Sequence, residues 1–189
     1  MRDADVRSAL RATVLARHLS DPATLVIDEL GLESGVVRVD IAVVNGRLHG
    51  YEIKSDADTL ERLPAQVEGY GRVFDRVTLV VGSRHAAAAQ RLVPKWWGVY
   101  VAEEDAAGRV RFRAARRERA NPGLDLHAVA ALLWRDEALA LLKARGRARG
   151  LRSKPRRDLY RALVESVTPT ALRRCVREAL KTRTTWRAA

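Results

Sequence analysis

The stretch VVRVDIAVVNGRLHGYEIK, residues 36–54, predicts the centre of the fold. Residues 36–44 are dense in β-branched side chains, which favour strands. Asn45-Gly46 is the strongest two-residue hairpin signal in the chain, because these residue types tolerate the backbone angles of the tightest turns. Residues 47–54 supply the returning strand. The sequence therefore predicts an antiparallel hairpin.

Helices and further strands are expected before and after this hairpin. Apolar residues spaced by three or four predict helices, and short continuous apolar runs predict buried strands. The expected helices cover residues 3–19, 24–32, 60–74 and 85–93, and the expected strands cover residues 76–82, 97–104 and 109–117. This order predicts an α/β fold in which helices flank a mixed central sheet.

The chain changes character near Asn121, where the strand patterns end. Beyond this point only helical patterns occur, over residues 126–144, 156–166 and 169–182. Thr168-Pro169 resembles a helix cap followed by a proline at the first helical position. We therefore predict an α/β domain over residues 1–120, followed by a small, basic, all-helical module over residues 121–189.

Positive charge is concentrated in the second half of the chain. The formal charge is −3 over residues 1–108 and +15 over residues 109–189, and residues 143–157 hold eight Lys or Arg and no acid. Such a distribution indicates contact with a polyanion such as nucleic acid. The alternative is that this arginine-rich stretch is only an exposed linker between packed helices.

Several protein classes are excluded by composition. The single cysteine, Cys175, allows neither a disulfide framework nor a zinc–cysteine cluster within the chain. No apolar run approaches the length of a membrane span. The start of the chain, MRDADVRSAL, lacks the apolar core of a secretory signal. We therefore expect a cytoplasmic location.

Three ionisable residues interrupt the two hairpin strands. Asp40 lies on the first, whereas Glu52 and Lys54 lie two residues apart on the second and so leave the same face of the sheet. Charge on a buried face is unfavourable unless it is paired or bound to metal. Two carboxylates on neighbouring strands suit Mg²⁺, or Mn²⁺ in its place. The alternative is an exposed Glu52–Lys54 pair, with Tyr51 and Ile53 on the buried side.

Together with its surroundings, this pattern resembles the PD-(D/E)XK nuclease superfamily. The motif is Asp40 followed, after the hairpin turn, by Glu52-Ile53-Lys54. Glu29 matches the position of the acid that those enzymes often carry in a helix ahead of the hairpin. The resemblance covers about residues 24–82, and it extends to a poorly characterised bacterial family of similar length.

The helix expected after the hairpin points to the RecB-like branch of that superfamily. Gln66 and Tyr70 match its QxxxY element, although Tyr70 could equally be a core residue. The resemblance implies a restriction-endonuclease-like core and a Mg²⁺-dependent deoxyribonuclease. The implied metal ligands are Asp40, Glu52, the carbonyl of Ile53 and, as a further acid, Glu29. The implied catalytic set is Asp40, Glu52, Lys54, Gln66 and Tyr70.

Two other functions fit the same sequence. One is a catalytically inactive, nuclease-fold protein that binds nucleic acid or acts as an adaptor. The other is a regulator that binds through its C-terminal helices as a helix-turn-helix-like unit. Metal binding by the N-terminal part would favour the nuclease over both.

Overall fold

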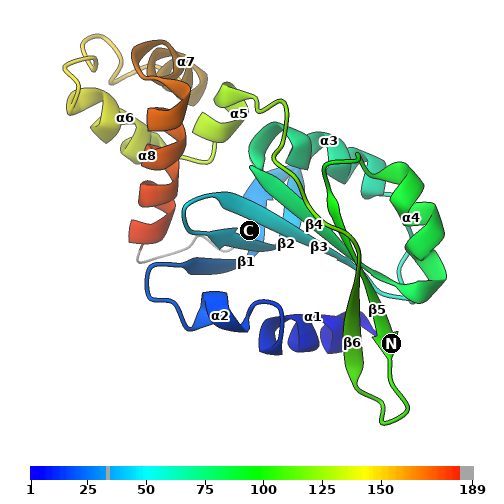
Figure 1. Ribbon diagram of the computed structural model, residues 1–189. Coiled ribbons are helices and arrows are strands. Elements are labelled where there is room, and N and C mark those ends of the chain that lie inside the picture. Colours follow the sequence, from blue (N-terminus) through cyan, green and yellow to red (C-terminus); the bar gives the residue numbers. More distant parts are fainter. Residues whose placement is uncertain (33–34, 184–189) are drawn as a thin grey trace.

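A computed structural model describes residues 1–32 and 35–183 of the chain. Its centre is a six-stranded sheet with the strand order β1-β2-β3-β4-β5-β6 (Figure 1). The strands are β1 (Leu25–Leu32), β2 (Val37–Val44), β3 (Leu48–Lys54), β4 (Arg76–Gly82), β5 (Gly98–Glu104) and β6 (Val110–Arg116). The helices are α1 (Asp3–Ala12), α2 (Ala16–Leu19), α3 (Leu63–Val73), the 3₁₀ turn η2 (Ser83–His85), α4 (Ala86–Leu92), α5 (Leu126–Ala130), α6 (Arg135–Lys143), α7 (Arg156–Ser166) and α8 (Pro169–Thr182).

The sheet is mixed, as predicted. β1, β2 and β3 are antiparallel neighbours, β3, β4 and β5 are parallel, and β6 returns antiparallel along β5 at the edge. The two parallel connections run through α3 and through α4, because a parallel strand can be reached only by a long crossover. The α/β class with a mixed, helix-flanked sheet is thus confirmed.

The hairpin around Asn45 is confirmed, and its pairing stops before the strands end. The ladder runs from Val44 opposite Leu48 to Ile41 opposite Tyr51. The turn is held by the side chain of Asn45, whose Oδ1 accepts a hydrogen bond of 3.1 Å from the amide of Arg47. Beyond Ile41 the two strands separate, which leaves room between them for side chains.

The helix predicted over residues 24–32 is wrong, because this segment forms β1. β1 pairs along the length of β2, from Leu25 opposite Val44 to Leu32 opposite Val37. A short helical pattern yields to strand pairing when the neighbouring strand offers a free edge and the segment contains β-branched residues. Glu29 therefore lies in a strand, not in a helix, and its φ of 56° makes it the one non-glycine residue with positive φ in the described chain.

Two other helical predictions were too long. The segment 3–19 forms α1 and α2 with a break between them, and the segment 126–144 forms α5 and α6. The carboxylate of Asp125 caps α5 by accepting the amides of His127 and Ala128. Thr168 caps α8 as expected, because its hydroxyl accepts the amide of Ala171.

Both faces of the sheet are covered by helices. α1 packs on one face, where Leu10 joins Ile41 and Ile53 in a buried cluster. α3 and the C-terminal helices pack on the other face, where Tyr70 and Leu172 belong to a second cluster. The helices of the two faces lie on opposite sides of the sheet in Figure 1. β3 is consequently buried on both sides.

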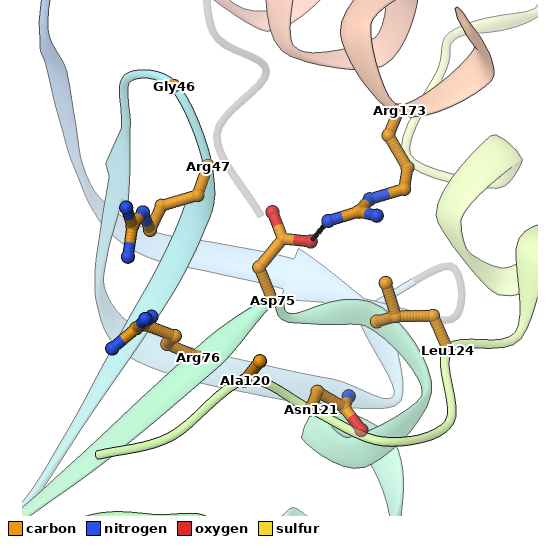
Figure 2. A pocket seen from close by; sticks show the side chains of 8 residues that line it. All are labelled: Gly46, Arg47, Asp75, Arg76, Ala120, Asn121, Leu124 and Arg173. Atoms are coloured by element: carbon orange, nitrogen blue, oxygen red, sulfur yellow. Dashed lines mark hydrogen bonds and ion pairs between the residues drawn. The ribbon is translucent and has the colours of Figure 1, made fainter. Parts of the chain in front are cut away.

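Polar contacts join the C-terminal helices to the sheet. Asp75 accepts the amide of Leu48 at 2.7 Å and is ion-paired with Arg173 of α8 (Figure 2). The side-chain amide of Asn121 donates to the carbonyls of Gly71 and Phe74 at the end of α3.

The division into two domains near residue 120 stays a prediction. Among the described residues, none of the helices has the length and apolar character of a membrane span.

Candidate functional site

The carboxylate of Glu52 is the centre of a buried polar network. Glu52 is 1% exposed and Lys54 is 7% exposed, so the alternative of a solvent-exposed pair is wrong. Oε1 of Glu52 accepts hydrogen bonds from Lys54 Nζ at 2.7 Å and from Gln66 Nε2 at 2.5 Å. Oε2 accepts from the hydroxyl of Tyr70 at 2.5 Å. Gln66 and Tyr70 reach it together because they lie one turn apart on α3.

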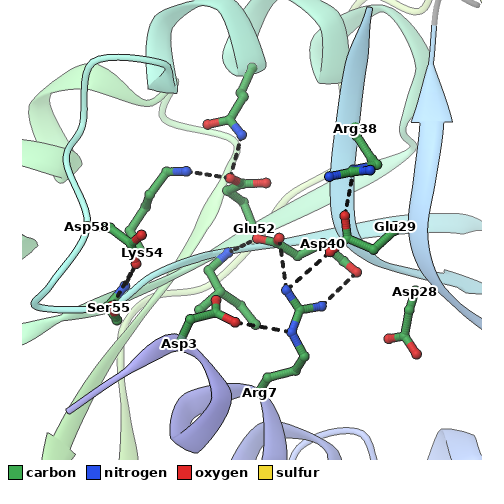
Figure 3. A network of polar contacts seen from close by, with 12 residues as sticks. Asp3, Arg7, Asp28, Glu29, Arg38, Asp40, Glu52, Lys54, Ser55 and Asp58 are labelled. Atoms are coloured by element: carbon green, nitrogen blue, oxygen red, sulfur yellow. Dashed lines mark hydrogen bonds and ion pairs between the residues drawn. The ribbon is translucent and has the colours of Figure 1, made fainter. Parts of the chain in front are cut away.

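Asp40 lies opposite Glu52, at the point where β2 and β3 separate. Its Oδ2 accepts the amide of Ile53 at 2.7 Å, which replaces a lost contact of the strand ladder. Its Oδ1 accepts from Nη2 of Arg7 at 3.0 Å, and Nη1 of Arg7 donates to the Asp40 carbonyl at 3.1 Å. Figure 3 shows the guanidinium group of Arg7 rising from α1 toward Asp40.

Arg7 is the residue of this network that the sequence did not single out. It forms ion pairs with Asp3, with Asp40 and with Glu29, the last at 3.4 Å. Glu29 is also paired with Arg38 at 2.5 Å, and its side chain is 42% exposed. Glu29 is thus joined to Asp40 through Arg7. The only sequence signal for Arg7 was its position four residues after Asp3 on a helix.

Burial and, next, the negative charge of Asp40 raise the pKa of Glu52 to about 7, against the opposing effect of Lys54. Burial and the charge of Glu52 also raise the pKa of Tyr70. The Tyr70 hydroxyl lies 2.7 Å from the carbonyl of Arg38 as well as near Glu52, and its single proton serves one of them at a time. A protonated Glu52 could donate to Tyr70 and free that proton for the Arg38 carbonyl.

The raised pKa of Glu52 predicts a pH-dependent stability. The folded protein holds the Glu52 proton up to about pH 7, whereas the unfolded chain releases it near 4.5. The contribution of this proton is therefore complete below pH 4.5 and is lost as the pH rises to 7, by on the order of 3 kcal/mol. Urea unfolding of wild type and Glu52→Gln from pH 4 to 8 measures it. Wild type should lose stability relative to the variant over this interval, and parallel curves would contradict the assignment.

The network does not fit a divalent metal as it stands. Both carboxylates are already engaged by donors of the chain, and two of those donors, Arg7 and Lys54, are cations. The described residues contain no group of three or more His, Cys, Asp or Glu side chains that could hold a metal ion. Mg²⁺ or Mn²⁺ at Asp40 and Glu52 stays a prediction, and such an ion would have to displace Arg7 and compete with Lys54.

The fold and the site define an α/β protein with a buried, internally paired carboxylate centre and a basic helical region. The chain belongs to the family described as Bacteriophage P4 protein cII, whose model matches residues 2–188. Protein cII of Enterobacteria phage P4 is 26% identical over 183 residues, which is 97% of this chain and 68% of that protein. No solved structure matches the chain.

This family membership corrects the assignment to the PD-(D/E)XK superfamily, which is wrong. The predictions of a metal-dependent deoxyribonuclease and of phosphodiester hydrolysis are wrong with it. The structure does bring Asp40, Glu52, Lys54, Gln66 and Tyr70 together. Glu52 is bonded to Lys54, Gln66 and Tyr70, however, and Asp40 to Arg7 and the amide of Ile53. Each carboxylate therefore accepts from donors of the chain, whereas a nuclease would leave it open for metal and water.

Proposed function

We propose that this protein binds DNA through the phosphate contacts of residues 143–157. The observation that carries the proposal is that all eight cations of this stretch are exposed: Lys143, Arg145, Arg147, Arg149, Arg152, Lys154, Arg156 and Arg157. They occupy the end of α6, the start of α7 and the loop between them. Lys and Arg side chains on an exposed loop can reach successive phosphates without reading the base sequence.

Several of these cations have no acidic partner among the described residues, unlike the arginines next to the β5–β6 turn. Within the described part of the chain, Arg147, Arg149 and Lys154 form no ion pair. Arg111 and Arg113 of β6, by contrast, are paired with Asp105 at 3.0 Å and with Glu103 at 3.5 Å. Charges that are not already neutralised by the protein gain most from a polyanion, because binding releases the counterions of the nucleic acid.

A membrane surface is a poorer partner for this stretch. Basic segments that lie on membranes combine their charge with exposed apolar side chains that enter the lipid. The large apolar side chains that are exposed in the described chain are Leu19, Val36 and Leu92, and none of them lies within residues 143–157. Charge without exposed apolar surface favours nucleic acid.

In this proposal the α/β part is a scaffold. The network around Glu52 fixes α1 and α3 to the hairpin, and Asp75 fixes α8 to the same hairpin. We also propose that the strands of the sheet are arranged as in a restriction-endonuclease-like core. We further propose that the protein is cytoplasmic and that its two domains meet near residue 120.

The test is the salt dependence of binding by the full chain. Fluorescence anisotropy with duplex DNA of two unrelated sequences should give equal affinities, and the logarithm of the binding constant should fall with the logarithm of salt with a slope of about −4.5 to −7, for five to eight contacts. Binding that is absent at low salt, or insensitive to salt, would refute the proposal. Duplex RNA of the same sequence is the comparison, and tighter binding to RNA would reassign the partner.

A further inference from the structure

A second basic feature lies on the other side of the β2–β3 turn, away from Asp75. It is a pocket of about 360 Å³ between α2 and the face of the sheet that α1 covers. Among its lining residues are Arg17, Arg47, Arg76, His49, Tyr51 and Tyr100. This volume is at the lower end of the range of about 300–1,000 Å³ found for small-molecule sites. The pocket therefore has room for one small ligand.

Three guanidinium groups face this pocket with one carboxylate among them. Arg76 is paired with Glu118 at 3.3 Å. Arg17 and Arg47 are exposed, and within the described residues their side chains form no ion pair. Figure 2 shows the guanidinium groups of Arg47 and Arg76 directed to the same side, away from Asp75. Like charges that are held close together favour a bound anion, and guanidinium groups suit phosphate in particular.

The electrostatic environment of His49 agrees with this excess of positive charge. Burial and, next, the positive charges of Arg76, His18 and Arg47 lower the pKa of His49 to about 3. The imidazole is therefore neutral, and its Nε2 lies 2.9 Å from the hydroxyl of Thr78. His49 adds a flat ring to the wall of the pocket and no charge.

Aromatic rings form the rest of the wall. The rings of His49 and Tyr51 are stacked, with centroids 4.3 Å apart and an angle of 23° between their planes. Tyr100 of β5 is partly buried and packs against the buried cluster that contains Tyr51. Flat rings next to guanidinium groups are the combination that proteins use for unpaired nucleotides, since the rings contact the base and the cations contact the phosphate.

We propose that this pocket binds one nucleotide, with its phosphate between Arg17 and Arg47 and its base against the ring wall that includes Tyr100. The site is separate from the stretch 143–157 and goes beyond the proposed function. The nucleotide has two possible sources, a free mononucleotide or the unpaired end of a strand. Both carry the same base and phosphate, so the experiment below separates them.

Calorimetric titration of the full chain with adenosine 5′-monophosphate, adenosine and inorganic phosphate tests the proposal. The nucleotide should bind at least about tenfold more tightly than adenosine or phosphate alone, because only it uses both parts of the pocket. In a variant that lacks Arg147, Arg149 and Lys154, a 5′-phosphorylated oligo-dA strand that binds more tightly than the mononucleotide would identify a strand end, and equal affinity would identify a free nucleotide. Equal binding of phosphate and nucleotide would overturn the proposal.

Variants locate the site. Arg17→Gln with Arg47→Gln should weaken nucleotide binding on the order of 100-fold, because two charge-assisted contacts are lost. Tyr100→Leu should weaken nucleotide binding about tenfold and leave phosphate binding unchanged. Arg91→Gln removes an exposed arginine from α4, on the opposite face of the sheet, and should change nothing. A loss in Arg91→Gln equal to the loss in the Arg17→Gln, Arg47→Gln double variant would overturn the assignment.

The nucleotide-binding proposal and the DNA-binding proposal can be refuted independently of each other. Replacing Arg147, Arg149 and Lys154 should leave the affinity for adenosine 5′-monophosphate unchanged, because these residues do not line the pocket. Parallel loss of nucleotide binding in that variant would place the nucleotide on the basic stretch and overturn the pocket proposal. Nucleotide binding without any duplex binding would refute the proposed function alone.

Discussion

Replacing Arg147, Arg149 and Lys154 with alanine should weaken binding to duplex DNA on the order of 100-fold at 0.1 M salt. Each phosphate contact contributes about −0.9 to the slope of the binding constant against salt, so three lost contacts should flatten that slope by about three. The three side chains are exposed, and the fold should keep its stability without them. Anisotropy titrations over a range of salt concentrations, with thermal melts of the same samples, measure both effects.

The matched control removes the same charge from another exposed part of the chain. Arg109, Arg111 and Arg113 lie at the β5–β6 turn and on β6, where they are paired with Asp105 or Glu103. Their replacement by alanine should change the binding constant by only about threefold, because long-range attraction is screened at 0.1 M salt. If both triple variants lose affinity equally, the net charge of the protein and not the stretch 143–157 determines binding.

The sequence was most informative where local signals and pairing agreed. Asn45-Gly46 marked the place of the hairpin turn, and the β-branched residues before it formed β2. Thr168 marked the start of α8 in the same way. The segment 24–32 was misjudged because its apolar spacing suits a helix, whereas the strand it forms depends on the free edge of β2, which no local pattern reveals.

The grouping of the site residues followed from spacing, but their chemistry did not. Glu52 and Lys54 are two residues apart on one strand, and Gln66 and Tyr70 are four residues apart on one helix. The periodicity of strands and helices therefore places the two residues of each pair on the same face. Which donors bind the two carboxylates depends on contacts between residues that are distant in sequence. Arg7 reaches Asp40 across 33 positions of the chain. No motif in the sequence distinguishes an acid that awaits a metal from an acid that is already paired.

Glu52→Ala should destabilise the folded protein by about 3–5 kcal/mol, because it leaves the charge of Lys54 buried without its partner. Lys54 is 7% exposed, and its ammonium group donates to Glu52 at 2.7 Å. The amide of Gln66 also loses its acceptor, and the hydroxyl of Tyr70 keeps only the carbonyl of Arg38. Urea unfolding at pH 8, where Glu52 is largely ionised, measures the loss.

A double variant separates the unpaired charge from the loss of packing. Glu52→Gln with Lys54→Met removes both charges and keeps the side chains close to their original size, so its stability should lie within about 2 kcal/mol of wild type. The new amide can also donate to Oε1 of Gln66, which is buried without a hydrogen-bond partner in the described structure. If the double variant is as unstable as Glu52→Ala, the cost comes from the shape of the site and not from Lys54. Recovery in the double variant would show that the pair is held together chiefly because neither charge can be buried alone, which is the behaviour expected of a structural centre.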